Sequence, residues 1–208
     1  MKVSELFESA EDINLAGKHL KGNLLKQKDI YNWSPITYRG NFYCQNNELT
    51  SLEGMPENVI GTVDVENNKL SSLIYSPLSI AKSFICKNNF ITSIENAPKY
   101  VKEDFDISNN KLTTLKDIEK HILTIKGKLI LSNNPIKASI SGVLKIRELQ
   151  GVTYTSGDPK VIEAFKVLEK HLIRNECLLN CLEEVITEED RFKKFEDEMI
   201  TLGLEYLL

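Results

Sequence analysis

The sequence lacks the features that mark a membrane-spanning or secreted protein. It contains no run of eighteen apolar residues, which a membrane-spanning helix needs. Its first residues, MKVSELFESAEDI, lack the apolar segment of a secretory signal peptide. The four cysteines form no CxxC pair, which argues against a zinc ribbon or a thioredoxin-like motif. We therefore expect a protein of a reducing, cytoplasmic compartment with free thiols.

Strong charge of one sign and known catalytic motifs are also missing. Residues 158–208 hold 7 Lys/Arg and 13 Asp/Glu, whereas the rest of the chain holds 19 and 17. Non-specific nucleic-acid binding needs a dense cationic surface, so we expect no nucleic-acid partner. No G-x-S-x-G, P-loop or HExxH is present, and His19, His121 and His171 lie in different predicted elements. We expect no catalytic residue, no metal, no cofactor and hence no enzyme.

What the chain does contain is one repeated pattern, seen in NNELTSLEGMP (46–56), NNKLSSLIYSP (67–77) and NNFITSIENAP (88–98). Apolar residues recur two and five positions after the second asparagine of each pair, and three and five positions before it. Columns that stay in phase predict a solenoid, in which stacked coils each add one short strand to a parallel sheet. The second asparagines, spaced by 21, 21, 21 and 24 residues, are Asn47, Asn68, Asn89, Asn110 and Asn134.

The pattern LxxLxLxxNxL with this period resembles the leucine-rich repeat family, in its short bacterial and phage type, over residues 38–157. The resemblance implies an α/β solenoid with a parallel β-sheet, and a phage or bacterial source. It places the protein in the cytoplasm of a bacterium or a host cell, or in a virion. We expect the second asparagines to form a structural ladder at the bend after each strand, because an amide side chain both donates and accepts there.

The ends of the chain depart from the repeat. We expect a helical cap over residues 3–20 and a degenerate coil over 20–39, together making an N-terminal unit of residues 1–37. Residues 158–208 are predicted to form C-terminal helices, with Asp158 as an N-cap before Pro159 and a capping box at Thr187.

Details of the coils also follow from the sequence. The 24-residue steps predict helical turns within 116–126 and 141–149. Residues 151–158 align with 127–134, which predicts a sixth, polar strand with Asp158 at the asparagine position. The prolines nine residues after the ladder asparagine predict extended backbone on the convex side, where no ladder hydrogen bond is required.

The outward residues of the strands are the candidate partner-binding site. Solenoids commonly bind on their concave sheet, and exposed apolar side chains among carboxylates are typical of a contact surface. A solvated face with strand-forming residues is the alternative. The candidates are Tyr43, Gln45, Asp64, Glu66, Ile85, Lys87, Asp104, Asp106 and Ile130.

The predicted function is a non-enzymatic interaction module that binds a partner protein on the concave sheet, such as an effector acting on a host protein. The sequence identifies neither the partner nor the oligomeric state. The alternative is a structural or virion-packaged phage protein, because Leu6-Phe7-Glu8 is similar to the cleavable leaders of T-even-type phage internal proteins. The simpler interpretation of this segment is an amphipathic capping helix.

The cysteines favour packing over chemistry. Cys44 and Cys86 share an inward column two coils apart, at about 9–10 Å, which is too far for a disulfide. Cys177 and Cys181 lie one helical turn apart, near His171, but two thiols without two further ligands make a weak metal site. Some bacterial leucine-rich repeat proteins carry a ubiquitin-ligase domain with a Cys-x-Asp nucleophile, which CLLNCLEE lacks.

Overall fold

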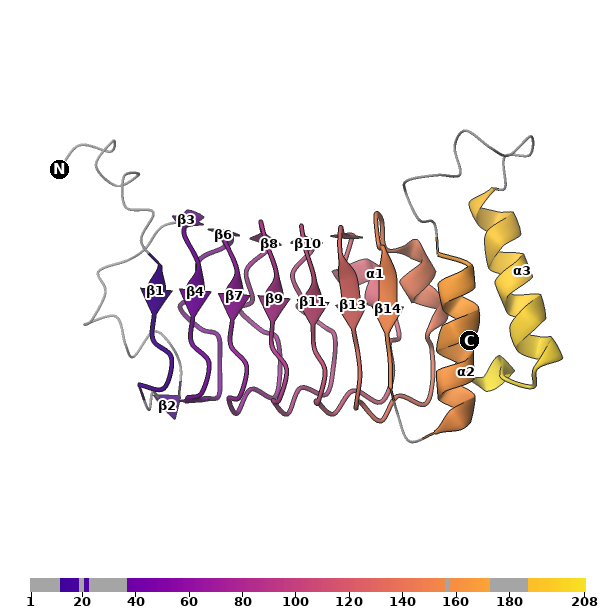
Figure 1. The fold of residues 1–208 in the computed structure, drawn as a ribbon, viewed down its shortest axis with the longest axis horizontal. Helices are drawn as coiled ribbons and strands as arrows, with labels where there is room; N and C mark the ends of the chain where they lie inside the picture. The colour runs from indigo at the N-terminus through magenta and orange to yellow at the C-terminus, as the bar shows by residue number, and fades with distance from the viewer. Residues whose placement is uncertain (1–11, 19–20, 23–36, 156–157, 173–186) are drawn as a thin grey trace.

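The chain folds as a parallel β-solenoid, in which successive coils stack side by side (Figure 1). The computed structural model describes residues 12–18, 21–22, 37–155, 158–172 and 187–208. Each coil adds one strand to a seven-stranded parallel sheet, in chain order. Its strands are β1 (Ile13–Asn14), β4 (Phe42–Tyr43), β7 (Val63–Asp64), β9 (Phe84–Ile85), β11 (Phe105–Asp106), β13 (Lys128–Ile130) and β14 (Gly151–Thr153).

A second parallel sheet runs along another side of the coils, where the sequence predicted no ladder. The proline of the repeat does lead into extended backbone, as predicted. The residue after it, however, has an N–H group that can donate a hydrogen bond to the preceding coil. After Pro77, the N–H of Leu78 donates to the carbonyl of Glu57 at 2.7 Å. The strands are β3 (Thr37–Arg39), β6 (Asn58–Ile60), β8 (Ser79–Ile80), β10 (Tyr100–Val101) and β12 (Thr124–Ile125). A third pair joins β2 (Lys21–Gly22) to β5 (Glu48–Leu49).

The core is formed by the inward columns of the strands. Successive strand residues point to opposite faces, so positions such as Phe84 and Cys86 point inward, while Ile85 points outward. The rings of Phe84 and Phe105 lie 5.2 Å apart. Full burial of one such side chain contributes about 1.5–3 kcal/mol relative to exposure. The fully buried columns are Phe42, Val63, Phe84, Phe105 and Leu129, and Cys44, Val65, Cys86, Ile107 and Leu131.

The longer coils use their extra residues for helical turns, as the 24-residue steps predict. In one coil, α1 (Ile118–His121) forms the turn and buries Ile118. In the next coil, the 3-10 helix η3 (Ser141–Lys145) buries Val143 and Leu144. The predicted helical turns within residues 116–126 and 141–149 are therefore confirmed.

The N-terminal part differs from the prediction. Residues 12–18 are not helical, because Ile13 of β1 pairs with Phe42 of β4 and extends the seven-stranded sheet. Ile13 and Leu15 are both buried, with a period of two that suits a strand. The helical cap over residues 3–20 is therefore wrong for its described part. Residues 1–11, 19–20 and 23–36, which include Trp33 and Pro35, lie outside the described residues.

The sixth predicted strand exists as β14, but its register is shifted by one residue. Gly151 pairs with Lys128 rather than with Gly127. A one-residue shift exchanges the two faces of a strand, so Val152 and Tyr154 point inward. Asp158 consequently does not take the asparagine position. Its side chain instead accepts from the N–H of Lys160 at 2.9 Å and caps the following helix.

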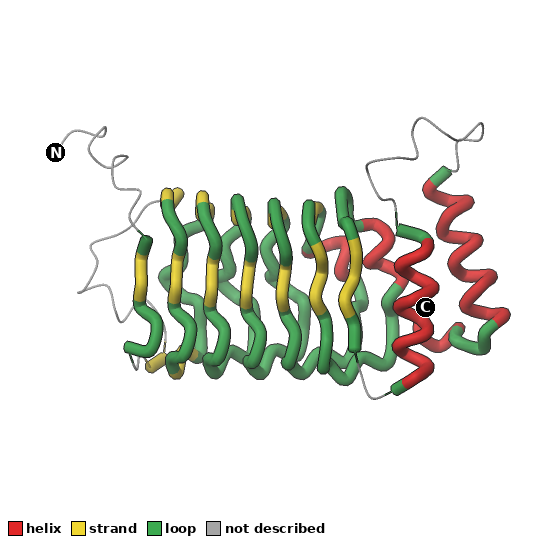
Figure 2. The backbone as a smooth tube through the Cα atoms, viewed as in Figure 1, coloured by secondary structure: helices red, strands yellow, loops and turns green. Residues whose placement is uncertain are grey.

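Two helices, α2 (Pro159–Lys170) and α3 (Glu188–Thr201), lie beside each other at the same end as β14 (Figure 2). Tyr154 stacks on Phe165 of α2 at 4.3 Å. Thr187 and Asp190 form the expected capping box of α3. A short 3-10 helix, η4 (Glu205–Leu207), ends the chain. In the part of the chain that the structure describes, no helix combines the length and apolar character of a membrane span.

Candidate interaction surface

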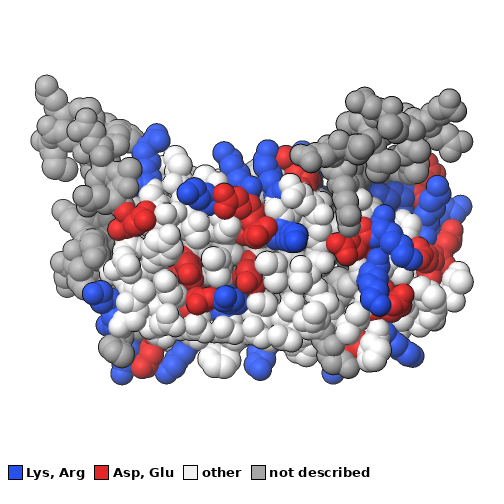
Figure 3. Space-filling model, viewed as in Figure 1, with Lys and Arg blue, Asp and Glu red and all other residues white. Residues whose placement is uncertain are grey.

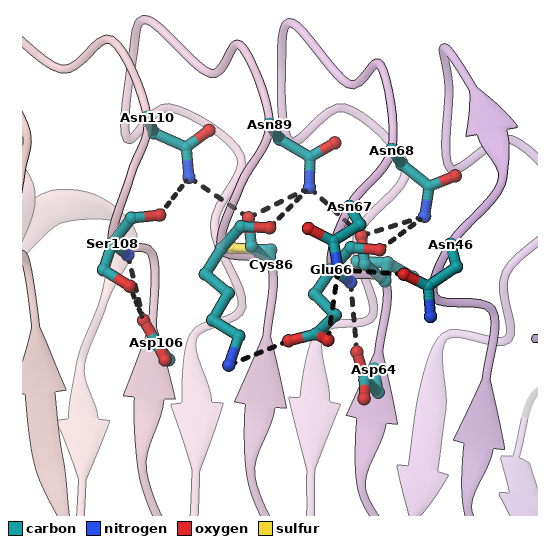
Figure 4. A network of polar contacts seen from close by, with 12 residues as sticks. Asn46, Asp64, Glu66, Asn67, Asn68, Cys86, Asn89, Asp106, Ser108 and Asn110 are labelled. Atoms are coloured by element: carbon teal, nitrogen blue, oxygen red, sulfur yellow. Dashed lines mark hydrogen bonds and ion pairs between the residues drawn. The ribbon is translucent and has the colours of Figure 1, made fainter.

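The second asparagine of each pair joins neighbouring coils. Asn68 donates from Nδ2 to the carbonyl of Cys44 in the preceding coil at 2.9 Å, and to the carbonyl of Val65 in its own coil at 3.0 Å. Figure 4 shows the equivalent bond from Asn110 to the carbonyl of Cys86, at 3.1 Å. The Oδ1 of Asn68 accepts from the N–H of Leu49 at 3.0 Å. Asn89, Asn110 and Asn134 repeat this geometry, and Asn47 makes the equivalent donations, to Leu15 and Cys44. These side chains are part of the scaffold.

The first asparagine of each pair has a different role, which was not predicted from the sequence. Asn46, Asn67, Asn88, Asn109 and Asn133 have φ between 53° and 59°. This left-handed region is costly for most L-residues but is tolerated by asparagine. Their exposed side chains also link coils, for example Asn67 Nδ2 to Asn46 Oδ1 at 2.9 Å. The repeated asparagine pair is the signal in the sequence that could have predicted this role, because the chain changes direction at each pair.

The middle outward column brings five of the predicted site residues into one line. Strand pairing sets Tyr43 beside Asp64, Asp64 beside Ile85, Ile85 beside Asp106, and Asp106 beside Ile130. All five are half-buried rather than exposed. Since adjacent strands are about 4.8 Å apart, the two aspartates flank Ile85 at a separation of about 10 Å.

Lys87 lies among the carboxylates at the centre of this face. Lys87 Nζ forms an ion pair with Glu66 at 2.9 Å. This hydrogen bond raises the pKa of Lys87, and Asp106 and Asp64 raise it further by charge attraction. Partial burial raises the pKa of Asp64, although the N–H of Glu66 opposes the shift. The face therefore holds more negative than positive charge, concentrated near its centre (Figure 3).

Several of these carboxylates also hold the backbone. Asp64 accepts from the N–H of Glu66 at 3.0 Å, and Asp106 accepts from the N–H of Ser108 at 2.9 Å. Asp104 accepts from the N–H of Lys128 in the next coil at 2.7 Å. Because a carboxylate has two oxygens and about four acceptor sites, each can contact a partner while it keeps these bonds.

Tyr43, Ile85 and Ile130, which were predicted to be exposed apolar residues of this face, lie on it but are half-buried, and more exposed apolar residues lie on another surface. On and just before the strands of the five-stranded sheet, Ile60, Leu78, Tyr100 and Leu123 are 45%, 37%, 43% and 38% exposed. Each strand of this sheet pairs over only two or three residues. So short a segment shows no periodic pattern from which its outward positions could be predicted.

The described thiols are unsuited to nucleophilic chemistry. Cys44 and Cys86 are free and buried, and burial raises the pKa of both thiols well above the usual value. His171 contacts Glu198 at 3.0 Å. Within the described ranges, no group of three or more His, Cys, Asp or Glu residues could hold a metal ion. Cys177, Cys181, His19 and the Leu6–Glu8 segment lie outside those ranges.

Comparisons with protein-family models, with curated proteins and with solved structures find no match. The structure itself establishes the architecture, through strands that pair in parallel at a spacing of about 21 residues. The chain is a parallel β-solenoid with the character of a repeat protein.

Proposed function

We propose that the chain is a non-enzymatic protein-interaction module that binds a partner protein on the outward face of the seven-stranded sheet. The observation that carries the proposal is the grouping of Asp64, Glu66 and Asp106 around Lys87, with Ile85 at the centre. A partner that presents a lysine or arginine beside an apolar side chain would complement this surface in charge and polarity.

Rigidity supports the same proposal. The outward residues sit on strands that are fixed on both sides by parallel neighbours and by the asparagine ladder. Binding to a preorganised surface loses less conformational entropy than binding to a loop, so more of the contact energy appears as affinity.

The finer assignment rests on the repeat pattern. We assign the solenoid to the leucine-rich repeat type of bacterial and phage proteins, and its role to an effector that acts on a host protein in the cytoplasm. Asparagine at each bend and an apolar residue two positions later support the repeat type. The buried thiols of Cys44 and Cys86 and the backbone bonds of the outward aspartates favour a binding role over catalysis.

The test is capture of a partner from host lysate, followed by titration of the purified partner by calorimetry. Ile85→Lys should weaken the complex by at least about tenfold, because it places a charge at the centre of the contact. Ile74→Lys makes the same change at an exposed isoleucine outside this face and should bind as the wild type does. Equal binding by all three proteins would contradict the proposal.

A further inference from the structure

The five-stranded sheet carries an apolar band made of Ile60, Leu78, Tyr100 and Leu123. These residues come from four successive coils, since β6, β8, β10 and β12 are neighbours in the sheet. The strand register sets Leu78 and Leu123 in one column on either side of Lys99, with Tyr100 one residue further along β10, whereas Ile60 lies in the column of Lys102. Contiguous exposed apolar groups on a polar surface indicate a contact surface.

Cations lie beside this apolar band. Lys99 and Lys102 flank β10, and Lys82 follows β8. All three are exposed, and none forms an ion pair with a carboxylate of the described chain. Lys126, in the next coil, differs because it pairs with Glu148 at 2.8 Å. The five-stranded sheet thus presents apolar groups together with Lys82, Lys99 and Lys102, which form no ion pair within the described residues.

The seven-stranded sheet presents the complementary set. Its central outward residues are Asp64, Glu66, Asp104 and Asp106 around Lys87, with Ile85 between the aspartates. Both surfaces are built from the same coils and share one strand spacing. Lys99 and Lys102 lie three residues apart along one strand, about 10 Å, which matches the two strand spacings between Asp64 and Asp106 when the axes of the two molecules cross.

We propose that the five-stranded sheet of one molecule docks on the seven-stranded sheet of a second copy of this chain. Lys99 and Lys102 meet the carboxylates of Asp64 and Asp106, and the apolar band covers Ile85. The two surfaces differ, so the contact is heterologous, and each dimer retains one free surface of each kind. Association is therefore expected to proceed beyond the dimer as the concentration rises.

Sedimentation velocity over a range of concentrations tests this contact. Asp64→Asn/Asp106→Asn retains the side-chain acceptors of both residues but removes their charge, and it should weaken self-association by about tenfold. Lys99→Glu/Lys102→Glu places like charges in contact and should weaken it by about a hundredfold. Lys111→Glu/Lys137→Glu makes the same charge change at exposed lysines elsewhere and should associate as the wild type does.

A mixture of the two interface variants gives the decisive result. Each variant keeps one intact surface, so the mixture should form a 1:1 dimer and nothing larger. Circular dichroism should show the wild-type fold for every variant. A wild type that stays monomeric at all concentrations, variants that associate as the wild type does, or a mixture that stays monomeric would each overturn the proposal.

The same variants separate this inference from the proposed partner binding. Lys99→Glu/Lys102→Glu leaves the seven-stranded sheet intact and should still capture a foreign partner. Failure of self-association with retained partner capture would overturn only the present proposal. Partner capture that is insensitive to Ile85→Lys would count only against the proposed function.

Discussion

The side-chain oxygen of Asn89 accepts a hydrogen bond from the backbone N–H of Leu70, in the preceding coil, at 3.0 Å. The same amide donates to the carbonyls of Val65 and Cys86, both at 3.1 Å. One buried side chain therefore satisfies backbone groups of two coils at a bend where the strands no longer pair with each other.

Removal of this amide should destabilise the solenoid. Asn89→Ala leaves a buried N–H and two carbonyls without these bonds, and we expect a loss of about 2–4 kcal/mol in the free energy of unfolding. Urea denaturation followed by circular dichroism measures the loss. Thr92→Ala, at an exposed position in the same coil, should change stability by less than about 0.5 kcal/mol. Equal stability of the two variants would contradict the ladder role.

The neighbouring asparagine should respond to backbone conformation instead. Asn88 has φ of 55°, which a β-branched residue adopts only with strain. Asn88→Val should cost about 1–2 kcal/mol, whereas Asn88→Gly should cost much less, because glycine adopts this φ without strain. Equal losses in thermal or urea unfolding would show that the side chain, and not φ, matters at this position.

Close approach of two coils at Gly61 makes a third prediction. A Cβ atom at this position would clash with the backbone carbonyl of Gly40, and backbone cannot move aside as a side chain can. Gly61→Ala should therefore cost about 1–3 kcal/mol, measured as the shift in urea midpoint at constant slope. Gly151→Ala is the matched control, because a Cβ there would approach only a Glu169 side-chain oxygen, at 3.3 Å. A larger loss for the control would contradict this account.

The joint between α2 and α3 should make stability depend on pH. Hydrogen bonds from Lys170 and His171 lower the pKa of Glu198 below its usual value. A carboxylate with a lowered folded-state pKa stabilises the fold above its unfolded-state pKa, and this contribution is lost as the pH falls through the folded-state value. Glu198→Gln should therefore be less stable than the wild type at pH 7, with the difference shrinking below about pH 4. Glu196→Gln, on the exposed side of α3, should show no such pH-dependent difference.

Asp64 should show the opposite sign. Burial raises its pKa in the folded state, so the charged form is less favoured there than in the unfolded chain. The fold therefore loses the contribution of this group as the pH rises from its unfolded-state pKa through its higher folded-state pKa. Asp64→Asn keeps the acceptor for the Glu66 N–H and should raise stability at pH 7 by less than about 1 kcal/mol, because solvent screens a half-buried charge. Chemical denaturation at pH 7 and pH 3 checks the sign, and a destabilised variant at pH 7 would contradict it.

The inward columns were predictable because burial repeats at fixed offsets through several coils. Phe84 and Cys86 could be placed inside from spacing alone. The register of β14 could not, because Gly151 marks a change of direction that fits either of two alignments. Only the packing of Tyr154 against Phe165 and its hydrogen bond to the carbonyl of Asn134 fix that register.

The outward surfaces were less predictable than the core. The strand period predicts that Asp64, Ile85 and Asp106 lie on the outward face of the sheet. It does not predict their partial burial, which depends on the size of the side chains in the neighbouring outward columns. The second sheet was not predicted because its strands pair over only two or three residues each. Strand β1 was missed because its coil lacks the asparagine pair.

The hydrogen bonds between the C-terminal residues and the coil at Ile140 affect the order in which the chain can fold during synthesis. Ile140 donates its N–H to the carbonyl of Leu207, and Ser141 donates its hydroxyl to the carbonyl of Leu208, across 67 residues of chain. Coils up to this point can stack as they leave the ribosome, since each contacts only its neighbours. The last coil must wait until residue 208 has emerged. During that interval the backbone N–H of Ile140 and the hydroxyl of Ser141 lack these acceptors, so this end of the solenoid is the part most open to contact with a neighbouring nascent chain.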